Sequence, residues 1–196
     1  MTKKQGTLFV ISAPSGAGKT TLVDKVVKAC PNVVRSISMT TRQIRKGEVS
    51  GRDYIFVSKE KFNSLIKSKG FLEYAQVFNN YYGSPKKNIE ADLKQKKDVI
   101  LTIDVQGAMS IRKIMADKAV LIFILPPKFA DLKKRLLKRK TDSAQEIACR
   151  LKVAKDELKY LDYYDYQIIN DDIKTAYKQL LSIFISTKCK VRNRRK

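Results

Sequence analysis

Apolar residues along this chain recur with two different periods, and the alternation between them predicts an α/β fold. Short apolar runs bounded by Gly, Pro or polar residues are typical of buried strands, whereas apolar residues three and four apart are typical of helices. Strand-like runs cover residues 7–12, 33–38, 54–57, 71–77, 99–104, 120–125 and 166–169. Helical spacing covers residues 19–30, 59–68, 86–95, 129–139, 144–160 and 172–185. Strands that alternate with helices predict a parallel sheet covered on both faces.

Two stretches depart from this alternation and predict insertions into a single domain. Residues 38–85 carry several short strand-like pieces with only one short helix between them. Residues 127–146 follow a buried strand, begin at a proline pair and carry a dense basic surface, which predicts a mobile lid. A chain of 196 residues suits one sizeable core but not two independent domains. The remaining segments are a core of residues 1–37, 86–126 and 147–187 and a basic tail of residues 188–196.

Composition argues against a membrane span and against a zinc site. No apolar run approaches the roughly 20 residues that a membrane helix needs. The chain has no histidine, and its three cysteines, Cys30, Cys149 and Cys189, are widely spaced without a CxxC pair. This pattern predicts a reducing, cytoplasmic location. Because histidine is the usual general base, the chemistry must use a carboxylate or need no base.

The formal charge of +22, from 41 Lys and Arg against 19 Asp and Glu, raises the question of a nucleic-acid partner. Only residues 188–196 form a dense basic cluster, and no stretch alternates aromatic residues with Arg or Gly as single-strand binders do. Lysines spread over solvated helix surfaces, with bound phosphates as the anionic partner, are the simpler explanation. We therefore expect nucleic acid to be at most a secondary partner.

The segment SAPSGAGKTTL, residues 12–22, resembles a phosphate-binding loop between a buried strand and an amphipathic helix. Consecutive backbone N–H groups at a helix N-terminus form an anion site there, a lysine reaches the outer phosphates, and the next hydroxyl binds magnesium. The usual first glycine is replaced by alanine, which is compatible with the loop if that position keeps a negative φ. A glycine turn that binds nothing is the alternative. The predicted nucleotide-binding residues are Ala13, Pro14, Ser15, Gly16, Ala17, Gly18, Lys19, Thr20 and Thr21, with Thr20 as the metal ligand.

Two further stretches carry residues suited to a phosphorylated acceptor. Arg42 and Arg45 lie three apart among hydroxyl residues, and planar guanidinium groups suit bidentate phosphate binding. Glu73 lies in an apolar strand, where an acid is costly unless it is paired or used. The alternative for Glu73 is a surface strand on which it pairs with a lysine.

Taken in order, these motifs resemble the guanylate kinase family over residues 8 to about 185. The resemblance rests on SAPSGAGKTTL, SISMTTRQIRKGEVSGRDYIFVS, FLEYAQVFNNYYGS, TIDVQGA, ILPP, RLLKRKTDS and IINDD. It implies a three-layer P-loop NTPase fold with a parallel sheet, an inserted mixed-strand GMP-binding subdomain and a small helical lid. It also implies transfer of the ATP γ-phosphoryl group to GMP, and to dGMP, with Mg²⁺ as the cofactor.

The same resemblance implies the acceptor pocket. Its arginines and tyrosines would bind the GMP phosphate, Glu73 would accept the guanine N1–H and amino hydrogens, and Ser84 would donate to the base oxygen. AMP has no such donor pair, and an unpaired buried group can discriminate by about 10⁴ or more. Asp104 would face magnesium or the acceptor; its alternative is a helix N-cap. Thr102 stands where the family has a second acid. The implied pocket residues are Ser38, Arg42, Arg45, Tyr54, Glu73, Tyr82, Ser84 and Asp104.

On the donor side, the resemblance implies arginines that close over the phosphates and an adenine site. Arg135, Arg139 and Arg150 would be the closing arginines, although an ordinary basic surface also explains them. Asn170 and Asp171 would lie near adenine, although a turn and helix cap also explains them. Lys19, Arg45, Arg139 and Arg150 would neutralise the transferred charge. No base is needed, because the acceptor phosphate, with a second pKa near 6, is already ionised.

Two other functions were weighed against these motifs. A non-catalytic binding module on the same fold would be expected to lack parts of the phosphate loop, but Lys19 and Thr20 are present. A P-loop kinase with another small acceptor would not need Glu73 together with Ser84.

Overall fold

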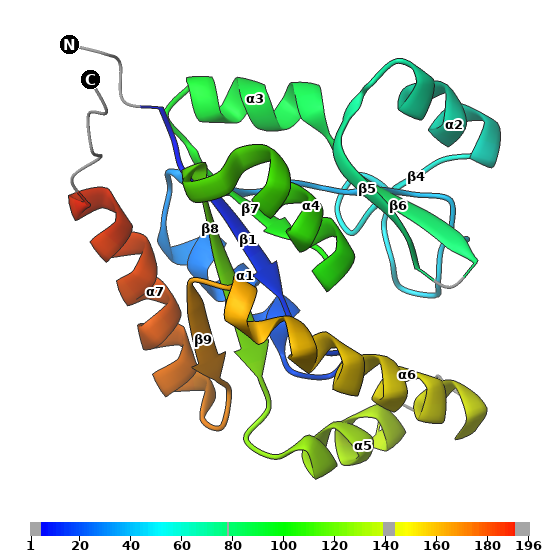
Figure 1. The fold of residues 1–196 in the computed structure, drawn as a ribbon, viewed down its shortest axis with the longest axis vertical. Coiled ribbons are helices and arrows are strands. Elements are labelled where there is room, and N and C mark those ends of the chain that lie inside the picture. Colours follow the sequence, from blue (N-terminus) through cyan, green and yellow to red (C-terminus); the bar gives the residue numbers. More distant parts are fainter. Residues whose placement is uncertain (1–4, 78, 139–143, 191–196) are drawn as a thin grey trace.

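The computed structural model describes residues 5–77, 79–138 and 144–190, and it confirms the three-layer α/β fold (Figure 1). A parallel sheet of five strands has the order β2-β7-β1-β8-β9. Its strands are β1 (Leu8–Ser12), β2 (Val33–Arg35), β7 (Asp98–Thr102), β8 (Ala119–Leu125) and β9 (Tyr166–Ile169). All their pairings are parallel, so the carboxyl ends of the strands share one edge, where the phosphate loop follows β1.

The central strand β1 explains why both faces of the sheet are covered. All five of its residues are buried. Because successive side chains point to opposite faces, Phe9 and Ile11 pack into one apolar cluster while Leu8 and Val10 pack into the other. Helices α1 (Lys19–Ala29) and α7 (Ile173–Cys189) cover the first face, and α3 (Lys86–Lys94) and α4 (Val105–Met115) cover the second.

Residues between the second and seventh strands form a separate mixed sheet with the order β4-β3-β6-β5. Its members are β3 (Met39–Thr40), β4 (Ile55–Phe56), β5 (Phe71–Val77) and β6 (Asn80–Pro85), and it carries helix α2 (Lys59–Lys67). β3 and β4 are parallel, whereas β3–β6 and β5–β6 are antiparallel. The mixed-strand character predicted for this part of the chain is therefore present.

The remaining elements lie beyond the carboxyl edge of the main sheet or connect its strands. Helices α5 (Phe129–Lys138) and α6 (Ala144–Glu157) pack on one another below that edge (Figure 1). Two 3-10 segments, η1 (Ala116–Lys118) and η2 (Leu158–Tyr163), complete the described chain. Whether residues 127–146 move as a lid stays a prediction.

Several boundaries differ from those that the sequence pattern predicted. Strand β6 was missed, because NYYGSP has no apolar alternation and becomes a strand only by pairing with β5. The expected strand at 33–38 is cut to Val33–Arg35. Helix α7 runs on to Cys189, so the first two residues of the predicted basic tail are helical. The last six residues lie outside the described chain.

No helix in the described ranges is long and apolar enough to cross a bilayer.

We predict that Phe184→Ala will lower the free energy of unfolding by about 3–5 kcal/mol, since it removes a fully packed aromatic ring. Phe184 of α7 stacks on Phe9 of β1 with ring centroids 3.8 Å apart, and both are buried. Urea denaturation measures the loss. Ile185→Ala is the matched control, because Ile185 is 57% exposed on the same helix, and it should change stability by no more than about 0.5 kcal/mol. Equal effects of the two changes would contradict this packing.

Candidate active site

A cavity of about 880 Å³ opens at the carboxyl edge of the main sheet. The phosphate loop, the second sheet and helix α6 all contribute to its walls. Most of the predicted site residues line it: Ala13, Pro14, Ser15, Gly16, Gly18, Lys19, Thr20, Thr21, Ser38, Arg42, Arg45, Tyr54, Glu73, Tyr82, Asp104 and Arg150. Five others do not: Ala17, Ser84, Arg135, Asn170 and Asp171. Arg139 lies outside the described residues.

The phosphate loop has the backbone conformation that an anion site requires. Gly16 and Gly18 adopt φ of 94° and 92°, in the left-handed region that favours glycine. Ala13 is not among the non-glycine residues with positive φ in the described chain, so alanine fits there as predicted. Helix α1 starts after Gly18, and within the described chain no side chain caps its first N–H groups. These N–H groups remain available to a phosphate at the positive end of the helix dipole.

Lys19 lies among carboxylates at the base of the cavity. Its ammonium is 3.5 Å from the carbonyl oxygen of Ile103. Burial lowers the pKa of Lys19, and the nearby Glu157 and Asp104 carboxylates oppose that shift. Burial raises the pKa of Glu157 to about 7, with Lys19 opposing. Glu157, the last residue of α6, was missed by the sequence analysis because nothing in KDELK separates it from a solvated helix acid.

Two residues predicted to bind ATP contact backbone carbonyl oxygens of the phosphate loop. The Asn170 side-chain amide is buried and donates to the carbonyl oxygen of Ala17 at 2.7 Å. Arg135 places one nitrogen 3.5 Å from the Gly16 carbonyl oxygen and another 3.5 Å from that of Asn170. Their contact with ATP stays a prediction, and so does that of Asp171, which is exposed. The neighbouring Asp172, rather than Asp171, caps helix α7.

Helix α6 reaches the phosphate loop through Arg150. Its guanidinium donates to the Ser15 hydroxyl at 3.0 Å. A cation from α6 therefore lies beside the loop that would hold the transferred phosphates.

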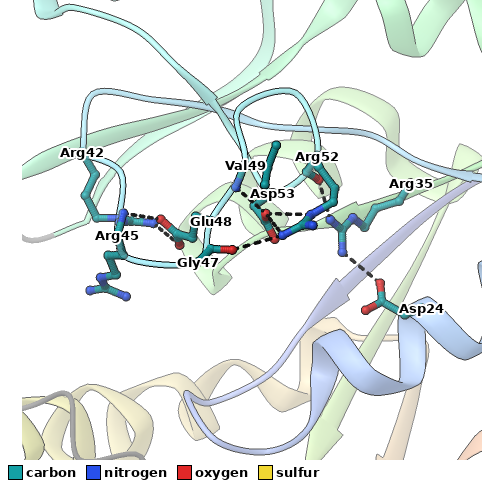
Figure 2. A network of polar contacts seen from close by, with 9 residues as sticks. All are labelled: Asp24, Arg35, Arg42, Arg45, Gly47, Glu48, Val49, Arg52 and Asp53. Atoms are coloured by element: carbon teal, nitrogen blue, oxygen red, sulfur yellow. Dashed lines mark hydrogen bonds and ion pairs between the residues drawn. The ribbon is translucent and has the colours of Figure 1, made fainter.

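On the opposite wall, one carboxylate organises the two predicted phosphate-binding arginines (Figure 2). Glu48 accepts a 2.7 Å bond from the Arg42 guanidinium and a 2.8 Å bond from the backbone N–H of Arg45. The Arg42 guanidinium also lies 5.5 Å from the ring centre of Tyr54 and 5.7 Å from that of Phe56. Burial by itself would lower the pKa of Arg42, but the hydrogen bonds and charges of Glu48 and Tyr82 together outweigh burial, and the pKa is raised. Arg42 is thus held in a fixed position.

Arg45 differs from Arg42, since among the described residues its side chain forms no hydrogen bond or ion pair, although its charge helps to lower the pKa of Glu48. Figure 2 shows it extending away from Glu48, and it lines the cavity. It is therefore the cation on this wall that is open to an acceptor phosphate. Glu48 was missed by the sequence analysis, although an acid three residues after Arg45 in a basic loop is a signal that could have found it.

A second set of contacts ties this acceptor loop to the core (Figure 2). Arg35 of β2 bonds Asp24 of α1 at 3.0 Å and the carbonyl oxygen of Arg52 at 2.9 Å. Asp53 in turn accepts from the backbone N–H of Val49 at 2.9 Å and from Arg52 at 3.0 Å. The loop that carries the acceptor arginines is thereby connected to the helix that begins at the phosphate loop.

The carboxyl group predicted to select the base is buried at the interface of β5 and β6. Glu73 is 6% exposed, and its Oε1 accepts a 2.5 Å bond from the hydroxyl of the fully buried Ser84. The alternative of a surface strand with a lysine partner is therefore wrong. Burial raises the pKa of Glu73 to about 7, with Ser84 opposing and Asp104 adding to the shift. The predicted bond from Ser84 to a base oxygen stays a prediction, because the Ser84 hydroxyl is bonded to Glu73 in this structure.

Other predicted acceptor residues line the same cavity as this carboxyl group. Tyr54 and Tyr82 meet edge to face with centroids 5.8 Å apart, and Ser38 is buried at the cavity wall. Asp104 lines the cavity and also accepts a 2.9 Å bond from the backbone N–H of Gly107. Its N-cap role, the alternative considered from the sequence, is confirmed.

We predict that Glu73→Gln will raise stability at neutral pH. Because the folded-state pKa near 7 lies above the ordinary 4.5, the stabilising contribution of Glu73 is full below pH 4.5 and is lost as the pH rises to about 7. The advantage of the variant should grow across that window to roughly 3 kcal/mol and then level off. Urea denaturation at several pH values measures it. Glu90→Gln, on an exposed helix face, is the control; an equal pH trend in both variants would contradict the burial effect.

Comparison with known proteins places the chain in one family. The family model for guanylate kinase matches residues 5–187. A guanylate kinase of Wolbachia pipientis is 50% identical over 181 residues, which are 92% of this chain and 90% of the relative. One of Caldanaerobacter subterraneus is 45% identical over 189 residues, covering 96% and 91%.

Solved structures agree. The crystal structure of guanylate kinase from Anaplasma phagocytophilum superimposes with a TM-score of 0.81 at 35% identity and covers 97% of this chain and 90% of that one. A shikimate kinase from Bacteroides thetaiotaomicron, with a TM-score of 0.52 at 13% identity, shares the fold alone. The family match, the relatives and the arrangement of the cavity lead to one conclusion: the chain belongs to the guanylate kinase family.

Proposed function

We propose that this protein transfers the γ-phosphoryl group of ATP to GMP, and to dGMP, giving ADP and GDP or dGDP. The single observation that carries the assignment is the buried Glu73 carboxyl group in the same cavity as the phosphate loop and the open Arg45. A base that presents two adjacent N–H donors would pair with that carboxyl group. Guanine has such a donor pair and adenine does not.

Transfer in this cavity requires positioning and charge neutralisation rather than a base. The acceptor phosphate has a second pKa near 6, so its attacking oxygen is already ionised at neutral pH. Arg45 would hold that phosphate, while the N–H groups of the loop and Lys19 would hold the donor phosphates. Arg150 stands beside Ser15 to neutralise charge between them. The absence of histidine from the chain is consistent with this chemistry. Arg139 is assigned a similar role only by family resemblance.

The residues present fit a magnesium ion that enters with ATP. Within the described ranges, no cluster of three Asp, Glu, Cys or His side chains could hold a metal by itself. Mg²⁺ usually takes only one or two protein oxygens and completes its shell with water and substrate phosphates. The Thr20 hydroxyl, exposed at the start of α1 and lining the cavity, would be the protein ligand. The ion would neutralise charge on the phosphates.

A cytoplasmic location stays a prediction.

The proposal predicts a clear order among acceptors. With ATP and magnesium, the purified protein should form ADP with GMP and dGMP, and kcat/KM should fall by about 10⁴ with AMP because Glu73 is left unpaired. CMP and UMP should be equally poor. ADP formation measured in parallel for all five acceptors tests this order. Equal rates with AMP and GMP would overturn the role of Glu73, and no acceptor-dependent turnover would favour a binding module.

We further predict that Lys19→Ala will lower kcat by at least about 10²-fold, the loss typical of removing one charge-stabilising group. GMP binding, measured by calorimetry, should persist, because the acceptor wall is built from other segments of the chain. Lys25→Ala, exposed on the same helix, is the matched control and should leave both quantities unchanged. Loss of GMP binding in Lys19→Ala would show that the donor and acceptor sites have been misplaced.

A further inference from the structure

Gly107, in the first turn of α4, lies directly against the base-selecting carboxyl group. A Cβ atom built at this glycine would be 2.5 Å from Glu73 Oε2 and 3.2 Å from its Cδ, whereas ordinary contact begins near 3.4 Å. Helix α4 lies beside β5, so these residues meet across two elements that are distant in sequence (Figure 1). Any side chain at position 107 would therefore compete for space with the carboxyl group.

The helix itself gives no reason for glycine here. Gly107 is buried within α4 and is not among the glycines of the described chain with positive φ. Glycine inside a helix is less favourable than alanine, because it loses more backbone entropy on folding. Its N–H caps onto Asp104 Oδ1 at 2.9 Å, and alanine would supply the same N–H. Alanine would fill the space beside Glu73, and its Cβ would also lie 3.2 Å from Cδ1 of Ile103, the end of an apolar side chain that can give way by a few tenths of an ångström.

Glu73 cannot move away from an added methyl group without disturbing its contacts with Ser84. Its backbone is paired with Ser84 in the β5–β6 ladder, and its Oε1 is bonded to the Ser84 hydroxyl at 2.5 Å. Relief of the clash would require Oε2 to shift by about 1 Å, either by rotation of the carboxyl group or by breaking the Ser84 bond. Because the atom that would shift is the end of a side chain, the fold can tolerate the change. The hydrogen-bond geometry of the Glu73 carboxyl group cannot.

We propose that Gly107 is a specificity-determining position of the acceptor site: the missing side chain leaves Glu73 Oε2 where it can accept the paired N–H donors of a guanine-type base. The inference rests on the proposed acceptor and deepens it. Gly107 does not touch the reacting phosphates. It acts through Glu73 and is thus a positioning residue.

Gly107→Ala should lower kcat/KM for GMP by about 30- to 100-fold, in line with the cost of an ångström of misplacement. Most of this loss should appear in KM for GMP, KM for ATP should be unchanged, and the preference for GMP over AMP should shrink by the same factor. The free energy of unfolding should be equal or higher, because alanine favours the helix. A purely structural role would instead lower stability and affect both substrates. Gln106→Ala, exposed on the same turn, is the matched control and should match the parent.

Pairing the change with Glu73→Asp separates steric positioning from other effects. Aspartate withdraws the carboxyl group by one methylene, so Gly107→Ala should cost little in that background, although Glu73→Asp alone impairs GMP use. Full GMP activity in Gly107→Ala, or additive losses in the double variant, would overturn the inference while leaving the proposed function intact. If the unmodified protein showed no GMP turnover, the proposed function would fail first. Calorimetric GMP binding by all four proteins provides a readout independent of turnover.

Discussion

The start of helix α1 is the constraint on which the site depends. A fully buried strand ends at the phosphate loop, two glycines turn the chain in the left-handed region, and the helix begins without a side-chain cap among the described residues. Uncapped N–H groups at a helix start need an acceptor, and a phosphate is the acceptor that best matches their dipole. Two side chains stabilise this loop conformation, because the buried Asn170 amide and the Arg135 guanidinium both contact carbonyl oxygens of the loop.

Around this anion site, cations and carboxylates are interleaved rather than gathered by sign. Glu48 neutralises Arg42 and fixes the acceptor loop, which leaves Arg45 as the open cation on that wall. Lys19 lies close to Glu157 and Asp104, whose charges favour its protonated form against burial. The cavity can therefore accept phosphates without holding several unpaired like charges together beforehand. The net charge of +22 is not explained by this site.

Local signals in the sequence predicted the main sheet and the phosphate loop well, and contacts between distant segments less completely. The five parallel strands are short apolar runs and the phosphate loop is a contiguous motif, so both could be recognised from residues that are adjacent in the sequence. Strand β6 could not, because its polar and aromatic residues become a strand only through pairing with β5. Glu157 has no local signal at all, since its importance comes from the fold bringing α6 to Lys19. The bond between Ser84 and Glu73 has no local signal for a similar reason, because it forms only where β5 and β6 pair.

This difference between local motifs and contacts of distant segments has a physical origin, and it bears on how acceptors would be selected. The proposed phosphate binding would use backbone N–H groups, whose geometry is set by a few neighbouring residues. The proposed base selection would depend instead on one carboxyl group, which bonds a cross-strand serine and lies against a glycine on a helix. Those contacts join segments about 10 and 30 residues away from Glu73. If these contacts select the base as proposed, a change of acceptor would require repacking between β5, β6 and α4, and the phosphate loop would not need to change.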